Sequence, residues 1–234
     1  MSVASERYDR VAVIGDIHGA SHLLRALIEQ VGDRHLISAG DVNDRGPDTR
    51  GVVDLLVQHG ATGVTGNHEQ WLRQWVRGEG FDRFALSRAM GGVATLESYG
   101  VDPGGHLDDA HFAVPLVHKR WLLERPVLLD LEVAGQPWWV VHAGLPMHLS
   151  LRGVPPDQVL PRLARNAPEE LLWPKGDPAL MPALDRPLIM GHVPLQEPFD
   201  GGHVVAVDTG AATFRTGGRL SALLLPERRF VSVG

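Results

Sequence analysis

Five short apolar segments of this chain each end in a polar cluster that is rich in glycine. The apolar segments are Val11–Ile14, Leu36–Ser38, Thr62–Thr65, Trp138–Val141 and Leu188–Met190. The residues that follow them are Gly15-Asp16-Ile17-His18-Gly19, Gly40-Asp41-Val42-Asn43-Asp44-Arg45-Gly46, Gly66-Asn67-His68-Glu69, His142-Ala143-Gly144 and Gly191-His192. Apolar runs bounded by glycine are typical of buried strands. Because ligands bind outside the carboxyl ends of strands in open α/β sheets, the five clusters are expected to converge.

The first third of the chain alternates between strand and helix patterns. Apolar residues at helical spacing predict a helix from Ser21 to Val31, with Ser21 as its cap. Asp48 is expected to cap a second helix that closes at Gly60, and a third helix is expected near Glu69–Arg77. Two successive strand–helix–strand units imply a parallel sheet that is buried on both faces.

The rest of the chain is expected to begin with a helical insert at about residues 78–124 and to continue mostly as strands. The helices predicted in the insert are Phe81–Met90, Val93–Ser98 and Val117–Glu124. The strands predicted after it, apart from those named above, are Val127–Val133, Val204–Val207, Leu220–Leu225 and Phe230–Val233, with a partly helical segment at Val154–Trp173. This pattern indicates a mixed α/β fold with two sheets, in one domain over residues 10–234 that follows a flexible head at residues 1–9.

Composition restricts the partners and the chemistry. The 234 residues include 22 basic and 28 acidic side chains, and a net charge of −6 speaks against nucleic acid as a partner. No apolar stretch is long enough to span a membrane, and the charged amino terminus does not resemble a secretion signal, so a cytoplasmic location is expected. The sequence has twelve histidines and no cysteine, so any metal ion must be held by nitrogen and oxygen ligands.

The polar clusters suit a pair of metal ions. Asp, Asn and His side chains without thiolate favour manganese, iron or zinc. A carboxylate that bridges two cations holds them about 3.5–4 Å apart, which is the spacing used for in-line displacement at phosphorus. Any one cluster alone is typical of a turn or a surface histidine. Five clusters at the same position relative to a strand favour one shared site.

The clusters resemble the sequence blocks of a known family. In order and spacing, the first three are similar to the signature blocks of the phosphoprotein phosphatase family of binuclear metallophosphoesterases. His142-Ala143-Gly144 and Gly191-His192-Val193-Pro194 resemble the two later histidine blocks of that family. The similarity runs from about residue 11 to the final strand, and small bacterial and phage members are the most alike. The resemblance implies the metallophosphoesterase fold, in which two mixed β-sheets pack together and are flanked by helices (αββα sandwich).

The resemblance also implies a role for individual residues. The metal ligands would be Asp16, His18, Asp41, Asn67, His142 and His192, with Asp41 bridging both ions. His68 would be the general acid, oriented by Asp44, and Arg45 and Asn67 would bind the phosphate. The nucleophile would be a metal-bridging hydroxide that attacks in line.

This chain departs from the family pattern at two places. Asn43 stands where members usually have a hydrophobic residue, and little effect is expected because the position is not a ligand. The second phosphate-binding arginine, which usually follows a tryptophan, is replaced in Trp173-Pro174-Lys175. Lys175 is the candidate substitute and Arg152 competes with it, while Lys175 as a solvated loop residue is an equal alternative.

Asp208-Thr209-Gly210 matches the tripeptide of aspartic proteases, but one copy does not supply the two facing carboxylates that such an enzyme needs. We interpret it as structural. The histidines outside the five clusters are interpreted as ordinary surface or core residues.

The function that the resemblance implies is a metal-dependent phosphomonoesterase that acts on phosphoserine and phosphothreonine in proteins or on a small phosphoester, with manganese as the expected metal. A symmetrical dinucleoside tetraphosphatase is the first alternative, because it would share all five blocks. A catalytically silent binding module is the second, and the intact clusters disfavour it. The sequence leaves the physiological substrate and the oligomeric state open.

Overall fold

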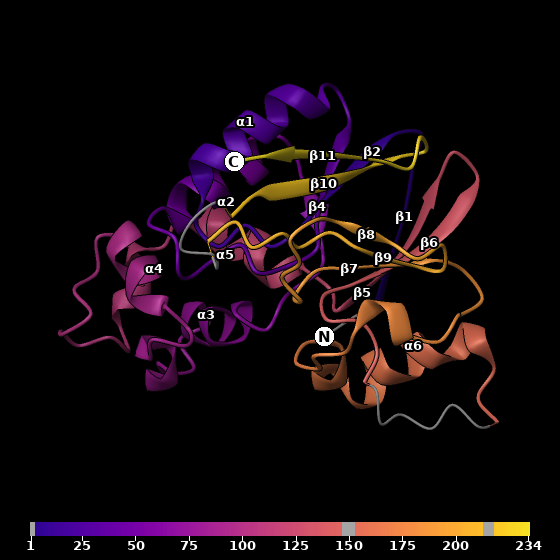
Figure 1. The fold of residues 1–234 in the computed structure, drawn as a ribbon. Coiled ribbons are helices and arrows are strands. Elements are labelled where there is room, and N and C mark those ends of the chain that lie inside the picture. The colour runs from indigo at the N-terminus through magenta and orange to yellow at the C-terminus, as the bar shows by residue number, and fades with distance from the viewer. Residues whose placement is uncertain (1–2, 147–152, 213–217) are drawn as a thin grey trace.

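In the computed structural model of the protein, two β-sheets pack face to face and helices cover both outer sides (Figure 1). The structure describes residues 3–146, 153–212 and 218–234. The strands are β1 (Val3–Tyr8), β2 (Val11–Ile14), β3 (His35–Ser38), β4 (Thr62–Gly63), β5 (Leu128–Val133), β6 (Gln136–Val141), β7 (Leu188–Met190), β8 (Phe199–Asp200), β9 (Val204–Ala206), β10 (Leu220–Leu225) and β11 (Arg229–Val233). The predicted αββα arrangement is confirmed.

The helix predicted at Ser21–Val31 has its predicted ends, the other predicted helices differ at theirs, and the helix predicted at Phe81–Met90 is only a short 3-10 turn at Arg83–Leu86. The helices are α1 (Ser21–Val31), α2 (Thr49–Gln58), α3 (Glu69–Val76), α4 (Gly92–Ser98), α5 (Leu116–Glu124) and α6 (Pro156–Asn166), with shorter 3-10 turns at Arg83–Leu86, Ala110–Ala113, Pro168–Leu171 and Pro178–Leu180. Asp48 caps α2 as predicted, because its side chain accepts a hydrogen bond from the Gly51 N–H. The N-cap of α1 is Ala20 and not Ser21, whose hydroxyl instead donates to Asp48 Oδ2 at 2.5 Å.

The first sheet has the strand order β11-β10-β2-β3-β4. β2, β3 and β4 run parallel, and β10 lies antiparallel to β2. All four residues of β2 are buried, which fits an apolar strand covered on both faces. The carboxyl ends of β2, β3 and β4 therefore lie side by side, as predicted.

The second sheet has the order β1-β5-β6-β7-β9-β8. β5 and β6 form the predicted antiparallel hairpin, and both turn residues, Ala134 and Gly135, have positive φ, as a tight two-residue turn requires. β6 and β7 run parallel, so His142 and His192 follow their ends on the same edge. Apolar side chains from both sheets fill the layer between them, among them Val13, Leu129 and Leu223.

The insert packs against the helices over the first sheet. Leu96 and Tyr99 belong to the same apolar cluster as Leu24 of α1 and Leu56 of α2. On the opposite side, α6 covers the second sheet (Figure 1). No helix in the described part of the chain is long and apolar enough to cross a membrane. The extent of the domain, residues 10–234, stays a prediction.

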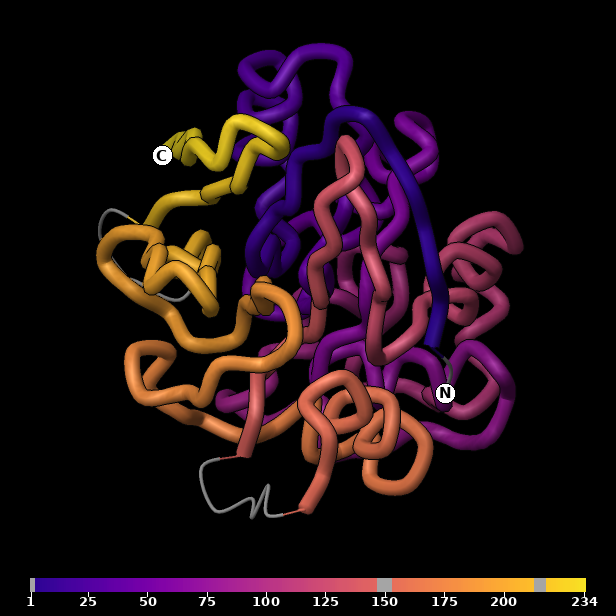
Figure 2. Tube along the Cα trace, turned by 90° about the vertical axis from the view of Figure 1, so that its right-hand side faces the viewer, coloured from indigo at the N-terminus to yellow at the C-terminus, as the bar shows by residue number. Residues whose placement is uncertain are grey.

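The amino-terminal head is not loose, so that prediction is wrong for residues 3–8. β1 pairs in parallel with β5 from Val3 opposite Leu128 to Tyr8 opposite Val133, and Figure 2 shows it alongside the hairpin. Its residues alternate between exposed and half-buried, because β1 is an edge strand. The charged residues that suggested a flexible segment lie on this edge, where Arg7 forms an ion pair with Glu132 at 2.8 Å.

Candidate metal centre

The five polar clusters meet at one end of the two sheets. All six predicted ligands, which are Asp16, His18, Asp41, Asn67, His142 and His192, are buried there. The clusters after β2, β3 and β4 come from the first sheet, and those after β6 and β7 come from the second. The backbone links the two sets, because the His192 N–H donates to Asp16 Oδ1 at 3.0 Å.

Asp41 lies at the middle of the cluster. Its Oδ2 atom is 3.6 Å from His18 Nε2, 3.4 Å from His142 Nε2 and 3.9 Å from His68 Nε2. Two groups of possible ligand atoms, each within 4.8 Å of one another, share this carboxylate: His18 and His68 form one group with it, and His142 and His192 form the other. Asp41 therefore lies between two groups of side chains that could each hold a cation.

The histidine rings are oriented as metal ligands usually are. His18 Nδ1 donates to the Asn43 carbonyl at 2.8 Å, and His142 Nδ1 donates to the Ala39 carbonyl at 2.9 Å, so the Nε2 atoms face the centre. His142 Nε2 lies 3.0 Å from Asn67 Oδ1 and 3.0 Å from His192 Nδ1. A proton on His142 Nε2 can be shared with Asn67 Oδ1 and His192 Nδ1. A metal cation placed between these three atoms would bind to the same lone pairs. The residues present therefore fit a metal ion.

The charges of the centre are strongly perturbed. Burial raises the pKa of Asp16 well above its usual range, and the neighbouring Asp208 carboxylate adds to the effect. Burial would also raise the pKa of Asp41, but the adjacent His142, His68 and His18 outweigh it and hold that pKa well below its usual range. Burial lowers the pKa of His18 and of His192 to about 3, so both rings are neutral near pH 7, as a metal-ligating imidazole must be. Carboxylates without water around them favour a bound cation.

His68 and Asp44 form a buried pair beside the centre. His68 Nδ1 lies 2.7 Å from Asp44 Oδ2, which also accepts a hydrogen bond from Trp71 Nε1 at 2.9 Å. Asp44 Oδ1 accepts from the Thr95 hydroxyl at 2.8 Å and from Asn43 Nδ2 at 2.9 Å. The carboxylate is thus fixed from several sides. From the sequence alone, Trp71 is interpreted as a core residue or as lining the face of the insert towards substrate, Thr95 has no predicted role, and little effect is expected of Asn43.

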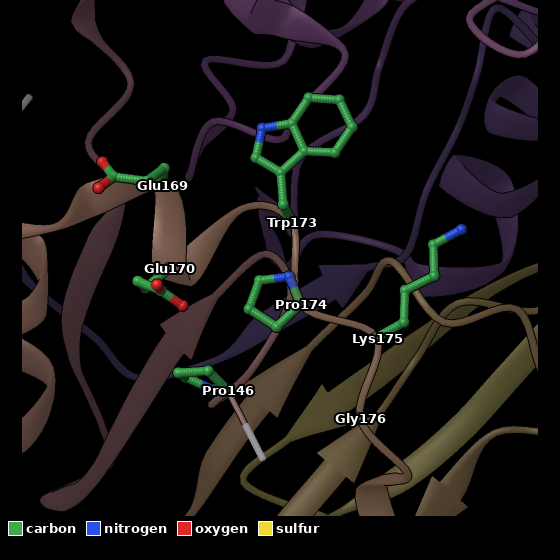
Figure 3. A pocket seen from close by; sticks show the side chains of 7 residues that line it. All are labelled: Pro146, Glu169, Glu170, Trp173, Pro174, Lys175 and Gly176. Carbon is green, nitrogen blue, oxygen red and sulfur yellow. The ribbon is translucent and has the colours of Figure 1, made fainter. Parts of the chain in front are cut away.

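The cationic side chains near the centre are Arg45 and Lys175. Arg45 Nη1 is 2.6 Å from His18 Nε2, and Arg45 Nη2 is 3.0 Å from His68 Nε2. Lys175 lines a pocket of ≈ 200 Å³ together with Asp41, Asn67 and Arg45. Figure 3 shows its amino group extending away from the carboxylates of Glu169 and Glu170. Arg152, the alternative to Lys175, lies outside the described residues.

Backbone strain gathers in this region. Seven described residues other than glycine have positive φ, and five of them belong to the site: His18, Asp41, Asp44, Arg45 and His192. Such conformations cost on the order of 1–3 kcal/mol each and persist where the surroundings enforce them, most often at functional sites.

The comparisons with known proteins decide the family. Residues 9–212 match the calcineurin-like phosphoesterase family. The chain belongs to this family. The phosphoesterase is 24% identical over 249 residues to the asymmetrical bis(5'-nucleosyl)-tetraphosphatase PrpE of Oceanobacillus iheyensis, a match that covers 96% of this chain and 92% of the relative. It is 43% identical over 72 residues to serine/threonine-protein phosphatase 1 of Salmonella typhimurium, covering 29% of this chain and 33% of that protein.

Solved structures agree on the fold of the phosphoesterase. A crystal structure described as a candidate diadenosine tetraphosphatase superposes with a TM-score of 0.65 at 22% identity, covering 99% of this chain and 96% of the other. A serine/threonine phosphatase from Saccharomyces cerevisiae superposes with a TM-score of 0.60 at 14% identity, covering 99% of this chain and 82% of the other. The protein is a phosphoric ester hydrolase of a family that uses two metal ions, and it has His and Asp groups able to bind them.

Glu69 connects two of the loops that carry predicted ligands of the phosphoesterase, and it has no predicted role from the sequence. Its buried carboxylate accepts hydrogen bonds from the backbone N–H groups of Asp41 at 2.9 Å, Val42 at 2.6 Å and Gly66 at 2.5 Å. Three backbone donors on one carboxylate fix the distance between the loop that carries Asp41 and the loop that carries Asn67. The only signal in the sequence was the position of Glu69 at the end of the third cluster.

Replacing Glu69 by glutamine is expected to destabilise the protein by about 1–3 kcal/mol, because the amide nitrogen cannot accept a hydrogen bond and leaves a buried N–H unsatisfied. Urea denaturation of Glu69→Gln and of the wild-type protein measures the difference. Glu29→Gln, on the exposed side of α1, is the matched control and should change the free energy of unfolding by less than about 0.5 kcal/mol. Equal stability of Glu69→Gln and the wild type would contradict the assigned role.

Proposed function

We propose that this phosphoesterase hydrolyses dinucleoside polyphosphates of the diadenosine tetraphosphate type. The observation that carries the proposal is the chemistry of the pocket over the metal centre. Two of its walls are Phe84, which is 57% exposed, and Trp173, which is 43% exposed. Exposed aromatic rings stack on nucleobases, and each stacked base adds about 1–3 kcal/mol. A phosphate between two nucleosides has such a base on each side.

Neighbouring pockets extend this site in two directions. A pocket of ≈ 610 Å³ shares Arg45 and Ala89 with the catalytic pocket, and another of ≈ 400 Å³ shares Trp173 and Lys175 with it. Figure 3 shows the second of these, with the Trp173 ring at its upper side. A ligand with a polyphosphate centre and two nucleoside ends matches this arrangement better than a single phosphorylated side chain does.

The roles of the residues follow the resemblance to the family. Asp16, His18, Asp41, Asn67, His142 and His192 would hold two metal ions, which would supply Lewis acidity at phosphorus and activate the attacking water. Arg45 and Lys175 bind phosphate oxygens, and Asn67 contributes at the same place. His68, held by Asp44, gives a proton to the leaving oxygen. His68 and Asp44 are already aligned by buried side chains, so this pair needs little reorganisation during the reaction.

We propose manganese as the metal, with iron and zinc as the alternatives, because carboxylate, amide and imidazole ligands suit all three. A cytoplasmic location, and phosphoester substrates in place of nucleic acid or membrane partners, remain our predictions from the sequence.

Hydrolysis of phosphoserine and phosphothreonine in proteins is the second candidate. The 43% identity to a serine/threonine phosphatase favours it, over a segment of 72 residues. The Oceanobacillus iheyensis relative, whose match covers nearly the whole chain, is an asymmetrical tetraphosphatase. The similarity outside the shared segment, where substrate-specific residues are expected, therefore favours the dinucleotide. It also favours asymmetrical cleavage over the symmetrical cleavage that the sequence suggested.

A substrate panel in manganese tests the proposal. Diadenosine tetraphosphate, a phosphoserine peptide and p-nitrophenyl phosphate are compared by kcat/KM, and the nucleotide products are separated by chromatography. We expect a preference for diadenosine tetraphosphate of at least about a hundredfold, since two stacked bases each contribute binding energy. AMP and ATP are the expected products, and two ADP molecules would instead show symmetrical cleavage.

Variants of the aromatic walls make the test specific. Phe84→Leu and Trp173→Leu should each raise KM for diadenosine tetraphosphate about tenfold, while KM for p-nitrophenyl phosphate stays within twofold of its wild-type value. Phe112→Leu is the matched control, because Phe112 is 76% exposed and does not line the catalytic pocket. Stronger turnover of the phosphopeptide than of the dinucleotide would replace the first candidate by the second.

A further inference from the structure

A second polar pocket, of ≈ 260 Å³, lies beside helix α3. Its lining residues are Thr65, Gln70, Arg73, Gln74, Arg77 and Glu79. None of them lines the catalytic pocket. Gln70, Arg73 and Gln74 come from α3, Arg77 and Glu79 follow its end, and Thr65 comes from the segment just after β4, so the pocket lies between this helix and the end of a strand.

Arg73 brings a positive charge that no carboxylate neutralises directly. Arg73 is a buried residue, 6% exposed, and its guanidinium donates to the backbone carbonyls of Arg125 at 2.7 Å and Leu123 at 3.2 Å. Within the described ranges, it forms no ion pair. Burial lowers the pKa of Arg73, and the positive charge of Arg77 lowers it further, while the carboxylate of Glu69 acts in the opposite direction without forming an ion pair with Arg73 in the described residues. A buried cation with neutral partners favours an anion beside it.

Arg77 adds a second cation at the mouth of the pocket. Its side chain is 41% exposed and faces Glu79 at 3.8 Å, the long end of ion-pair distances. The three charged lining residues sum to +1, in a protein whose formal net charge is −6. The pocket is therefore locally cationic, although the molecule as a whole is acidic.

Thr65 supplies the observation that points to a ligand. Its side chain is 1% exposed, and its Oγ1 atom has no hydrogen-bond partner. The backbone N–H of the same residue is satisfied, since it donates to the Pro126 carbonyl at 2.8 Å. Buried hydroxyl groups in proteins are nearly always hydrogen-bonded. An unpartnered hydroxyl in the wall of a cationic pocket is suited to donate to an anionic oxygen.

We propose that this pocket is a second anion site, which binds a phosphate group separately from the catalytic pocket. The hydroxyl of Thr65 and the guanidinium groups of Arg73 and Arg77 contact the oxyanion, and the side-chain amides of Gln70 and Gln74 complete its surroundings. Inorganic phosphate and the phosphate of a nucleotide share this chemistry. The inference does not depend on which substrate the catalytic pocket takes.

The pocket is connected to the catalytic site through one hydrogen bond. Gln70 Oε1 accepts from Trp173 Nε1 at 2.7 Å, and Trp173 is a wall of the catalytic pocket. An oxyanion that accepts a hydrogen bond from the Gln70 amide changes the position of this side chain, and through the hydrogen bond to Trp173 it also changes the orientation of the ring. Because coupling between two sites is reciprocal, a ligand stacked on Trp173 alters the affinity of the second site by the same factor.

Equilibrium dialysis of the manganese-loaded protein against labelled inorganic phosphate tests the proposal. Wild-type protein should bind two phosphates per chain. Thr65→Val, which keeps the shape and removes the hydroxyl, and Arg77→Gln, which removes an exposed charge, should each weaken one of them at least roughly tenfold. Arg25→Gln on α1 makes the same charge change at an exposed position and should leave both sites intact.

The outcomes separate this proposal from the proposed function. The proposal is overturned if no phosphate bound by the wild type loses affinity in Thr65→Val and Arg77→Gln, whether the wild type binds one phosphate per chain or two. Melting temperatures within a few degrees of wild type show that the variants are folded. If Thr65→Val does not fold, the phosphate affinity of Arg77→Gln decides whether the second site exists. AMP added as a competitor distinguishes inorganic phosphate from a nucleotide as the ligand of the second site. If AMP displaces both bound phosphates, the second site also accepts nucleotides. If AMP displaces only one of them, the second site takes inorganic phosphate. A protein that fails to cleave diadenosine tetraphosphate can still bind the second phosphate.

Discussion

Replacement of Asp41 by alanine is expected to remove metal and activity together. Its carboxylate belongs to both groups of possible ligands, so its loss opens both cation sites. We expect less than one metal ion per chain and a fall in kcat/KM on the order of a thousandfold or more, which corresponds to about 4 kcal/mol of transition-state stabilisation. Metal analysis by mass spectrometry and turnover of p-nitrophenyl phosphate in manganese measure the two effects.

Two controls limit the interpretation of Asp41→Ala. Asp157→Ala changes an exposed carboxylate in the first turn of α6 and should keep metal and activity. Because Asp41 Oδ1 also accepts the His68 N–H at 3.0 Å, circular dichroism should establish that the variant is folded. Full occupancy by two metal ions in folded Asp41→Ala would show that Asp41 does not bridge them.

The second large effect is expected for His68→Ala. If His68 protonates the leaving oxygen, its removal slows substrates with poor leaving groups far more than those with good ones. We expect kcat to fall by about 10²–10⁴-fold for an alkyl phosphate and by less than about tenfold for p-nitrophenyl phosphate. Asp44→Asn should change kcat on each of the two substrates in the same direction as His68→Ala does, because the Asp44 carboxylate holds His68 Nδ1 at 2.7 Å.

Metal content decides between two roles of His68. Its ring lies with His18 and Asp41 in one of the two groups of possible ligands, so the geometry alone allows it to be a ligand. The acid role requires that His68→Ala retain two metal ions per chain. Loss of an ion, or an equal loss of rate on both leaving groups, would make His68 a ligand or a structural residue.

The sequence predicted the strands that carry the chemistry well, because their signals are local. Val11–Ile14 and Leu188–Met190 have the predicted ends, and so does Leu220–Leu225, which carries none of the five clusters; each is an apolar run bounded by a turn. The cap at Asp48 was also predictable, since a side chain that accepts from a residue three positions later depends only on neighbouring residues.

Predictions failed where a segment depends on a distant partner. Residues 3–8 carry charges and lack a continuous apolar run, so they resembled a loose head, and only pairing with β5 makes them a strand. Ser21 has the right chemistry for a cap, but the Asp48 carboxylate takes its hydroxyl. Neither partner is adjacent in the sequence.

For the candidate site, the sequence by itself determined which ligand types follow which strands, because a strand that ends in glycine and Asp or His is a local pattern. It thereby indicated a nitrogen- and oxygen-liganded metal pair and the family. Only the tertiary structure placed Asp41 between two sets of histidines, fixed Asp44 through Trp71 and Thr95, and brought Phe84 and Trp173 to one pocket. These contacts join residues from separate elements, and their geometry is set by how the sheets and the insert pack.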